Sequence, residues 1–366
     1  MPAAELRAEA RRVMEVCNAC RYCEGYCAVF PAMELRRSFA DGDLDYLANL
    51  CHACRSCYYA CQYAPPHEFG INLPRAFALL RAETYAEHAW PRPFARLFAR
   101  NGLVVALACA LGIAAVLLLT LALRPAEALY GAHDGPGAFY AVIPEAAMVA
   151  VAVAAFGFAL LALALGVARF WRSAGAGGLP RPRPLARALG DVLTLRHLGG
   201  GGQGCNDRDE GFSPTRRRLH HGLSYGFLLC FASTTVAAAY DHFLAWPAPY
   251  PFWSWPVVLG TLGGLGMVAG AGGLLGLKLV ADPAPNAPRL LGGDVALLFL
   301  LGMTAATGLL LLALRSTGAM GILLAVHLGF VLALFLVMPY SKFVHGPFRA
   351  AALLRFAMER EAEERR

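Results

Sequence analysis

Six long stretches of this 366-residue chain contain no Asp, Glu, Lys or Arg. A helix needs about 20 apolar residues to cross a bilayer, and every stretch is long enough. Only helices and closed barrels satisfy their backbone hydrogen bonds in lipid, and barrel strands are shorter and alternate in hydropathy. The pattern therefore predicts six membrane-spanning helices, at residues 102–123, 146–168, 219–240, 257–277, 295–314 and 318–340.

The composition agrees with a membrane protein. Hydrophobic residues make up 58% of the chain and charged residues only 16%, whereas soluble domains are about a quarter charged. A soluble enzyme and a disordered chain are excluded. The formal charge of +7 indicates no nucleic-acid partner, because a membrane protein carries such an excess in its loops. We expect contact with membrane lipid and none with nucleic acid.

The distribution of Lys and Arg predicts the orientation, because cytoplasmic loops carry an excess of both. When the N-terminus is placed inside, 30 of the 32 Lys and Arg residues face the cytoplasm, and only Arg124 and Arg315 lie outside. Residues 1–16 also lack the apolar core of a signal peptide. We expect a multi-pass protein of the cytoplasmic (inner) membrane whose two termini and cysteine-rich head are cytoplasmic.

Eight of the 11 cysteines lie between residues 17 and 61. Residues 17–31 (CNACRYCEGYCAVFP) and 51–65 (CHACRSCYYACQYAP) are two copies of C-x-A-C-R-x-C-x-x-x-C-x-x-x-P. Two C-x2-C-x2-C-x3-C runs are typical of a protein that holds two 4Fe–4S clusters through cysteine thiolates. The predicted metal ligands are Cys17, Cys20, Cys23, Cys27, Cys51, Cys54, Cys57 and Cys61.

In two-cluster ferredoxins the fourth cysteine of each run binds the other cluster. By that rule Cys61 completes the cluster of the first run, and Cys27 completes that of the second. The alternative is a pair of zinc sites, which is disfavoured because zinc ligands usually come as separated C-x2-4-C pairs. The sequence around the runs lacks strand-like alternation, which favours an α-helical ferredoxin-like domain. The other cysteines, Cys109, Cys205 and Cys230, are isolated.

Five histidines lie inside the apolar stretches or near their ends, and ionisable residues at membrane depth are functional candidates. They are His220, His221, His242, His327 and His345. In the predicted topology His220, His221 and His345 lie at the cytoplasmic end, and His242 and His327 lie toward the outer side. Each level thus receives a histidine from the third span and one from the sixth, as two stacked bis-histidine b-type haems require.

His327 and His345 are 18 residues apart, which corresponds to five helical turns. They share a face if the last helix continues past Pro339, although a proline can kink a helix and shift its phase. Helix phase favours His220 over His221 as the inner ligand, and both remain candidates. The alternatives to two haems are one haem, or none with the histidines as polar residues at the interface.

Two glycine-rich segments each allow two interpretations. The fourth span contains eight glycines; they favour close helix packing, and the alternative is that they leave room for a planar cofactor. The run GGGGQG at residues 199–204 follows no predicted strand, which favours a flexible loop over a phosphate cradle. No Walker or H-E-x-x-H motif appears, so we expect an oxidoreductase subunit without its own substrate-dehydrogenating site.

Three further segments are distinctive: GCNDRDEGFSPTRRRLHHGLSYGFLLCF (204–231), APYPFWSWPVVLGTLGG (248–264) and MPYSKFVHG (338–346). Together with the cysteine repeat they resemble the tricarballylate (citrate) utilization protein B family, over residues 16–355. The resemblance supports the eight cysteines as cluster ligands. The spacing of His327 and His345 is also similar to that on a helix of the nitrate reductase gamma subunit, a di-haem cytochrome b.

The resemblance implies a membrane iron–sulfur protein that also binds haem and reoxidises the FAD of a separate tricarballylate dehydrogenase, which converts tricarballylate to cis-aconitate. We expect electrons to pass from that FAD through the clusters and haem to quinone. The alternatives are a redox-regulated tricarboxylate transporter or sensor, and a subunit for a different flavin dehydrogenase. A transporter would place polar ligands at mid-membrane, where these spans offer almost none.

The predicted fold is all-α, with an N-terminal α-helical ferredoxin-like two-cluster domain followed by a six-helix transmembrane bundle. The predicted boundaries are residues 1–100 for the head, 101–355 for the bundle with a cytoplasmic loop at 169–218, and 356–366 for a charged C-terminal tail.

Overall fold

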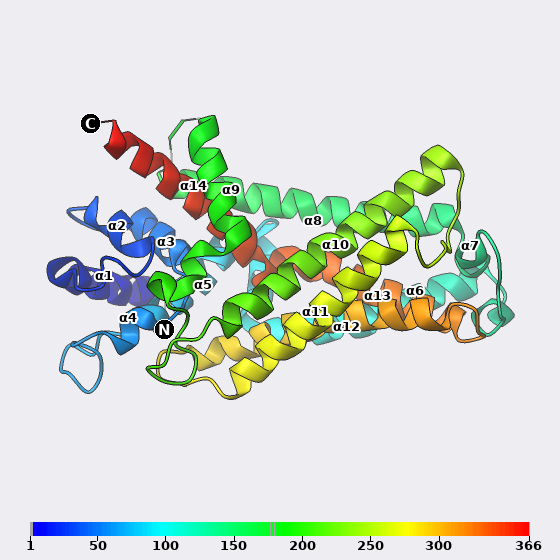
Figure 1. Cartoon of the computed structure of the whole chain (residues 1–366), viewed down its shortest axis with the longest axis horizontal. Helices are drawn as coiled ribbons and strands as arrows, with labels where there is room; N and C mark the ends of the chain where they lie inside the picture. The colour runs from blue at the N-terminus through cyan, green and yellow to red at the C-terminus, as the bar shows by residue number, and fades with distance from the viewer. Residues whose placement is uncertain (1–2, 176, 179, 366) are drawn as a thin grey trace.

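The computed structural model describes residues 3–175, 177–178 and 180–365. In these residues the regular secondary structure is helical, apart from one isolated antiparallel bridge between Cys205 and Ser213. The cysteine-rich head lies at one end of a long bundle, and the connection that contains α7 (Ala138–Val142) lies at the other end (Figure 1). The all-α fold predicted from the sequence is confirmed.

The head contains five helices around an apolar core. They are α1 (Ala3–Cys20), α2 (Val29–Glu34), α3 (Asp41–Leu50), α4 (Ser56–Tyr59) and α5 (Leu73–His88). One face of α1 is buried, with Leu6, Ala10 and Val13 turned inward, because its apolar residues recur every three or four positions. Helix α5 begins at a side-chain cap, where Asn72 accepts a hydrogen bond from the Arg75 N–H.

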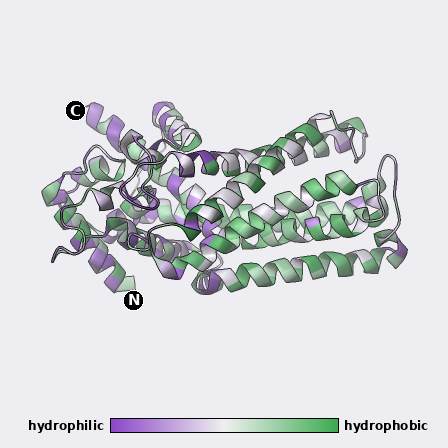
Figure 2. Ribbon diagram, turned by 60° about the horizontal axis from the view of Figure 1, so that its bottom comes forward, coloured by the Kyte–Doolittle hydropathy of each residue, from purple (hydrophilic) through white to green (hydrophobic). Residues whose placement is uncertain are grey.

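Within the described residues, six helices are long and apolar enough to cross a membrane, which confirms the predicted number of spans. They are α6 (Asn101–Leu123), α8 (Glu145–Ser173), α10 (Thr215–Leu244), α11 (Trp255–Leu279), α12 (Leu291–Leu314) and α13 (Met320–Val337). Hydrophobic residues dominate these helices, whereas hydrophilic residues concentrate in the head (Figure 2).

Short helices form the connections. Four of them precede or join the spans: η1 (Arg92–Arg100), η2 (Ala126–Leu129), η3 (Arg196–Gly202) and η4 (Pro288–Leu290). An amphipathic helix, α9 (Pro182–Thr194), lies between α8 and α10 and packs against the last helix of the chain. The head end of the bundle is therefore covered by the head, by α9 and by the last helix together.

Glycines bring α10 and α11 into direct backbone contact. A Cβ added at Gly270 would lie 2.5 Å from the backbone nitrogen of Leu223, and one at Gly263 would lie 2.8 Å from that of Cys230. Gly226 of α10 faces α11 in the same way, because a Cβ there would lie 2.7 Å from the Gly263 carbonyl. These contacts support tight helix packing, one of the two interpretations of the glycines in the fourth span.

The last spanning helix ends before Pro339. Helix α13 stops at Val337, and two 3-10 turns follow, η5 (Met338–Tyr340) and η6 (Lys342–Val344). Ser341 between them is extended, with φ −118° and ψ 179°. Proline cannot continue the helical hydrogen-bond ladder, so the continuous face that would unite His327 and His345 does not form.

The final helix, α14 (His345–Glu364), leaves the bundle and packs on the head. Its residue Glu359 accepts hydrogen bonds from Arg36 and Tyr46 of the head, and its Phe356 is buried. Residues 356–364, expected as a charged tail, are thus the second half of this docked helix.

Candidate functional site

The eight cysteines of the two runs gather into two groups, and all their thiols are free. In the first group, burial and then repulsion from Cys61, Cys23 and Cys20 raise the pKa of Cys17 to about 12. The same four residues line one pocket. Cys61 belongs to the second run in sequence, so this group takes its fourth member from the other run.

The second group contains Cys27 from the first run. Burial raises the pKa of Cys27 well above its usual value, followed by repulsion from Cys54 and Cys51. Burial raises the pKa of Cys57 as well, followed by repulsion from Cys54, Cys27 and Cys51. Cys57 also lines the pocket of the first group, so the groups are adjacent. These neighbours agree with the crossed membership expected from the sequence, which stays a prediction together with the ligation of iron.

The cysteine groups are wider than a zinc site requires. Thiolates bound to one Zn²⁺ at about 2.3 Å have their sulfurs roughly 3.8 Å apart. Among the described residues, the only three ligand atoms of His, Cys, Asp or Glu within 4.8 Å of one another belong to Glu145, Asp241 and His242. No three cysteine sulfurs come that close, which suits thiolates spread around a four-iron cluster.

One backbone feature recurs at equivalent positions of the two cysteine runs. Arg21 and Arg55 occupy equivalent positions, and both have a left-handed φ, of 56° and 70°. This conformation is uncommon outside glycine. Arg21 follows the end of α1 and Arg55 precedes the start of α4, so the backbone changes direction at the same position of each run. In the second run, the backbone N–H of Ala53 donates to the Cys51 sulfur at 3.3 Å.

The glycine run at residues 199–204 covers the second cysteine run. Gly200 has a φ of +50°, and a Cβ added there would collide with Ser56 Oγ. Cys205 is buried beside Cys54, and the Asn206 N–H donates to the Cys54 carbonyl at 2.9 Å. The segment is thus a packed cover instead of the predicted flexible loop. A cysteine directly after a glycine run was the only sequence signal for it.

His220 of α10 and His345 of α14 face each other at the head end of the bundle. Their ring centroids are 6.0 Å apart, and the ring planes make an angle of 82°. Two imidazoles on opposite sides of one metal ion, each with its nitrogen at about 2 Å, have ring centroids roughly 6 Å apart. We call these two residues the histidine pair; its separation suits axial coordination of one haem iron.

Hydrogen bonds leave Nε2 of each ring available to a metal. His345 Nδ1 donates to the Lys342 carbonyl at 2.5 Å. His220 Nδ1 lies 3.0 Å from Ser224 Oγ, which donates its own hydrogen to the His220 carbonyl and so accepts from the ring. Metal-binding histidines usually hold their second N–H in this way. Burial also lowers the pKa of His345 well below its usual value, which keeps it neutral, the form that binds metal.

The other candidate histidines lie apart from this pair. His221 faces Tyr225, with ring centroids 5.6 Å apart. His327 packs on α12, where its Nδ1 lies 3.2 Å from Thr307 Oγ1. Of the two residues proposed for the inner position, His220 is therefore the one that the structure places opposite His345.

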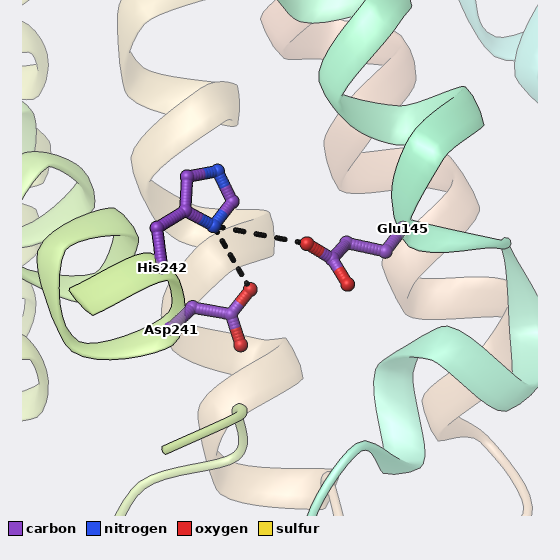
Figure 3. Close-up of side chains that lie close together, drawn as sticks. All are labelled: Glu145, Asp241 and His242. Carbon is purple, nitrogen blue, oxygen red and sulfur yellow. Dashed lines mark ion pairs between the residues drawn. The ribbon is translucent and has the colours of Figure 1, made fainter. Parts of the chain in front are cut away.

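His242 lies at the end of the bundle away from the head. Its Nδ1 is 3.6 Å from Asp241 and 3.8 Å from Glu145 of α8 (Figure 3). Tyr140 donates a hydrogen bond to Asp241 at 2.8 Å. His242 is in the last turn of α10 and half exposed, so carboxylates at the surface are its nearest partners. The structure does not bring His242 and His327 together as the predicted outer haem requires.

Two arginines connect the histidine pair to the second cysteine run. Arg216 and Arg349 each lie four residues from a histidine of the pair. Arg216 donates to the Ala53 carbonyl at 2.6 Å, and Arg349 donates to the Cys51 carbonyl at 2.9 Å. The cysteine loop of the head and the histidine pair of the bundle are therefore neighbours.

These features define a class: an all-helical, multi-pass membrane protein with a cysteine-rich, ferredoxin-like head. Residues 96–366 match the family model of citrate utilization protein B, and residues 10–87 match its Fer4-like domain. The chain is 49% identical to citrate utilization protein B of Escherichia coli over 360 residues, which cover 97% of this chain and 93% of that protein. The chain belongs to the citrate utilization protein B family. No solved structure is significantly similar to it.

Proposed function

We propose that this protein is a membrane electron-transfer subunit, which accepts electrons from the reduced FAD of a partner dehydrogenase and delivers them to quinone. The observation that carries the proposal is the contact between the second cysteine run and the histidine pair, through Arg216 and Arg349. This contact joins a set of ligands for iron–sulfur clusters to a set of ligands for haem. Oxidation of the organic acid belongs to the partner.

Two 4Fe–4S clusters and one b-type haem would supply the one-electron carriers. The crossed cysteine groups would hold the clusters, and His220 and His345 would hold the haem. Around them the protein excludes water by burial, and the Ala53 N–H on the Cys51 sulfur stabilises a thiolate. The geometry supports the haem at the head end, and we do not extend the proposal to a second haem at His242 and His327.

We place the head on the cytoplasmic side of the inner membrane. The head, the connections at its end of the bundle and the C-terminal segment together carry 30 of the 32 Lys and Arg residues, and this asymmetry is typical of the cytoplasmic side. A reducing compartment also keeps the cysteines available for iron. A soluble flavoprotein would then meet the clusters directly, and quinone would be reached from within the lipid.

The partner is inferred from the family. The relative from Escherichia coli is named for citrate utilization, and the family resemblance implies a tricarballylate dehydrogenase that contains FAD. We propose such a dehydrogenase as the electron donor. The chemical requirement on the donor is a reduced flavin exposed to the head, so a flavoprotein for another organic acid is the second candidate.

The test is quinone reduction by the full chain in lipid nanodiscs, with the dehydrogenase and tricarballylate added. We expect reduction to require both proteins and to be lost in Cys54→Ser, while the dehydrogenase still oxidises its substrate with an artificial acceptor. Cys109→Ser is the matched control, because Cys109 lies in α6 away from the runs. A normal rate in Cys54→Ser contradicts the proposal, as does uptake of labelled tricarballylate by vesicles that contain only this chain.

A further inference from the structure

Two guanidinium groups, of Arg81 and Arg349, contact the second cysteine run. Arg81 donates to the carbonyls of Ala48 and Cys51, and Arg349 donates to that of Cys51. The Nε of Arg349 is buried without a hydrogen-bond partner. Arginine stays protonated in proteins, so Arg349 is a cation at neutral pH.

Nearby carboxylates do not neutralise Arg81 and Arg349, whereas Arg216 is paired with Asp207. Asp294 is held by Lys278 at 2.5 Å and also pairs with Lys342. Asp207 is 3.7 Å from Arg216. In the part of the chain that the structure describes, Arg81 and Arg349 form no ion pair and donate to main-chain carbonyls. A buried cation without a counter-charge is strongly unfavourable, so an anion from outside the chain is expected.

The positions of two of these arginines indicate which anion. Arg216 precedes His220 by four residues on α10, and Arg349 follows His345 by four residues on α14. Each arginine is thus one turn, about 6 Å along its helix, from its histidine. Both reach the cysteine loop of the head, so they lie on the same side of the pair. A haem carries its two carboxylate groups on one edge of the macrocycle, and the arginine fork is suited to carboxylates.

We infer that Arg216 and Arg349 bind the two carboxylate groups of the haem whose iron would be held by His220 and His345. The inference rests on the proposed function and adds the residues that orient the haem. With its carboxylates on these arginines, the haem edge faces the Cys51–Cys54 loop, because the same guanidinium groups contact that loop. Arg216 and Arg349 are positioning residues in this assignment.

A competing role is neutralisation of the anionic cluster at the second cysteine run. Arg81 serves as the matched control for this role. It donates to the same Cys51 carbonyl as Arg349, but it comes from α5, which carries neither histidine of the pair. Arg81→Gln therefore removes a cation that contacts the cysteine loop from a helix without a proposed haem ligand.

The experiment compares haem with haem dimethyl ester, in which both carboxylates are blocked. Full-length protein is depleted of haem, titrated with each compound and followed by the absorbance of the reduced b-type spectrum. Hydrogen bonds to charged groups predict that wild type prefers haem by at least about tenfold. We expect Arg216→Gln and Arg349→Gln to lose this preference for haem while their content of non-haem iron stays unchanged. Arg349→Lys should recover part of the preference. Arg81→Gln should keep the wild-type preference.

The outcomes separate this inference from the proposed function. Equal binding of haem and its dimethyl ester by wild type overturns the inference alone. Loss of iron in Arg216→Gln and Arg349→Gln with an unchanged preference for haem also overturns it, and assigns the arginines to the cluster. Failure of wild type to bind either compound overturns the haem of the proposed function together with this inference.

Discussion

Arg36 of the head and Glu359 of α14 form an ion pair at 2.6 Å, although 323 residues separate them in the chain. Their side chains are only 8% and 21% exposed, and Tyr46 donates a second hydrogen bond to Glu359 at 3.0 Å. This pair fastens the last helix to the cysteine-rich head. It therefore belongs among the contacts that hold the head on the bundle.

Replacing Glu359 with Gln should weaken this attachment. The substitution removes one of the two carboxylates that pair with Arg36 in a poorly solvated position, at a cost of about 2 kcal/mol, while Asp43 still pairs with it. The melting temperature of the detergent-purified protein should fall, and α14 should exchange its amide hydrogens faster. Glu364→Gln is the control, because its pair with Arg187 is exposed and such pairs contribute little. Equal melting temperatures for the two variants would contradict the attachment.

The crossed cysteine groups predict which variants resemble each other. Cys27→Ser and Cys57→Ser should lose the same cluster and give the same residual electron paramagnetic resonance spectrum. Cys61→Ser and Cys17→Ser should share the other residual spectrum, and each variant should retain about half of the iron. If Cys27→Ser instead resembles Cys17→Ser, the fourth cysteine of each run binds within its own run.

The histidine pair predicts a sharp division among the histidine variants. His220→Ala and His345→Ala should each lower the haem content by at least about tenfold, because an axial ligand is lost. His221→Ala and His242→Ala should retain haem, since their rings face Tyr225 and surface carboxylates. The measurement is the reduced b-type absorbance relative to protein. Normal haem in His345→Ala would show that the iron lies elsewhere.

The glycine contact between α10 and α11 should matter for the histidine pair, because α10 carries His220. Gly270→Leu would drive a side chain into the backbone of Leu223, at a cost of about 1–3 kcal/mol. We expect lower thermal stability and reduced haem content. Gly272→Leu is the matched control on the same helix, because no atom lies within 4 Å of an added Cβ there. Similar losses in both variants would point to a general effect on α11.

The spans and the cysteine repeat were predictable because each depends on local constraints. A bilayer requires long charge-free segments, and a cubane cluster requires closely spaced thiolates. The crossed grouping of Cys27 and Cys61 also followed from a general rule. None of these inferences needed knowledge of which segments meet in space.

The remaining features depend on tertiary contacts. The choice of His220 over His221 depends on where α14 begins, and that is decided by the break around Pro339 and Ser341. His242 is in helical phase with His220 on α10, but its ring lies beside the carboxylate of Glu145 and does not face His327. The cover formed by Gly200 also could not be foreseen, because its contact with Ser56 joins segments far apart in the chain.

Helix α14 has a consequence for how the protein is made. The head is translated first, whereas the helix that packs on it is translated last. At synthesis rates of about 5–20 residues per second, the roughly 260 residues between them delay the final docking by about 13–52 s. During that interval the face of the head beneath α14, including Tyr46, is uncovered while six spans enter the membrane. The docking of α14 on α3 is therefore the last step in assembling the head end of the bundle.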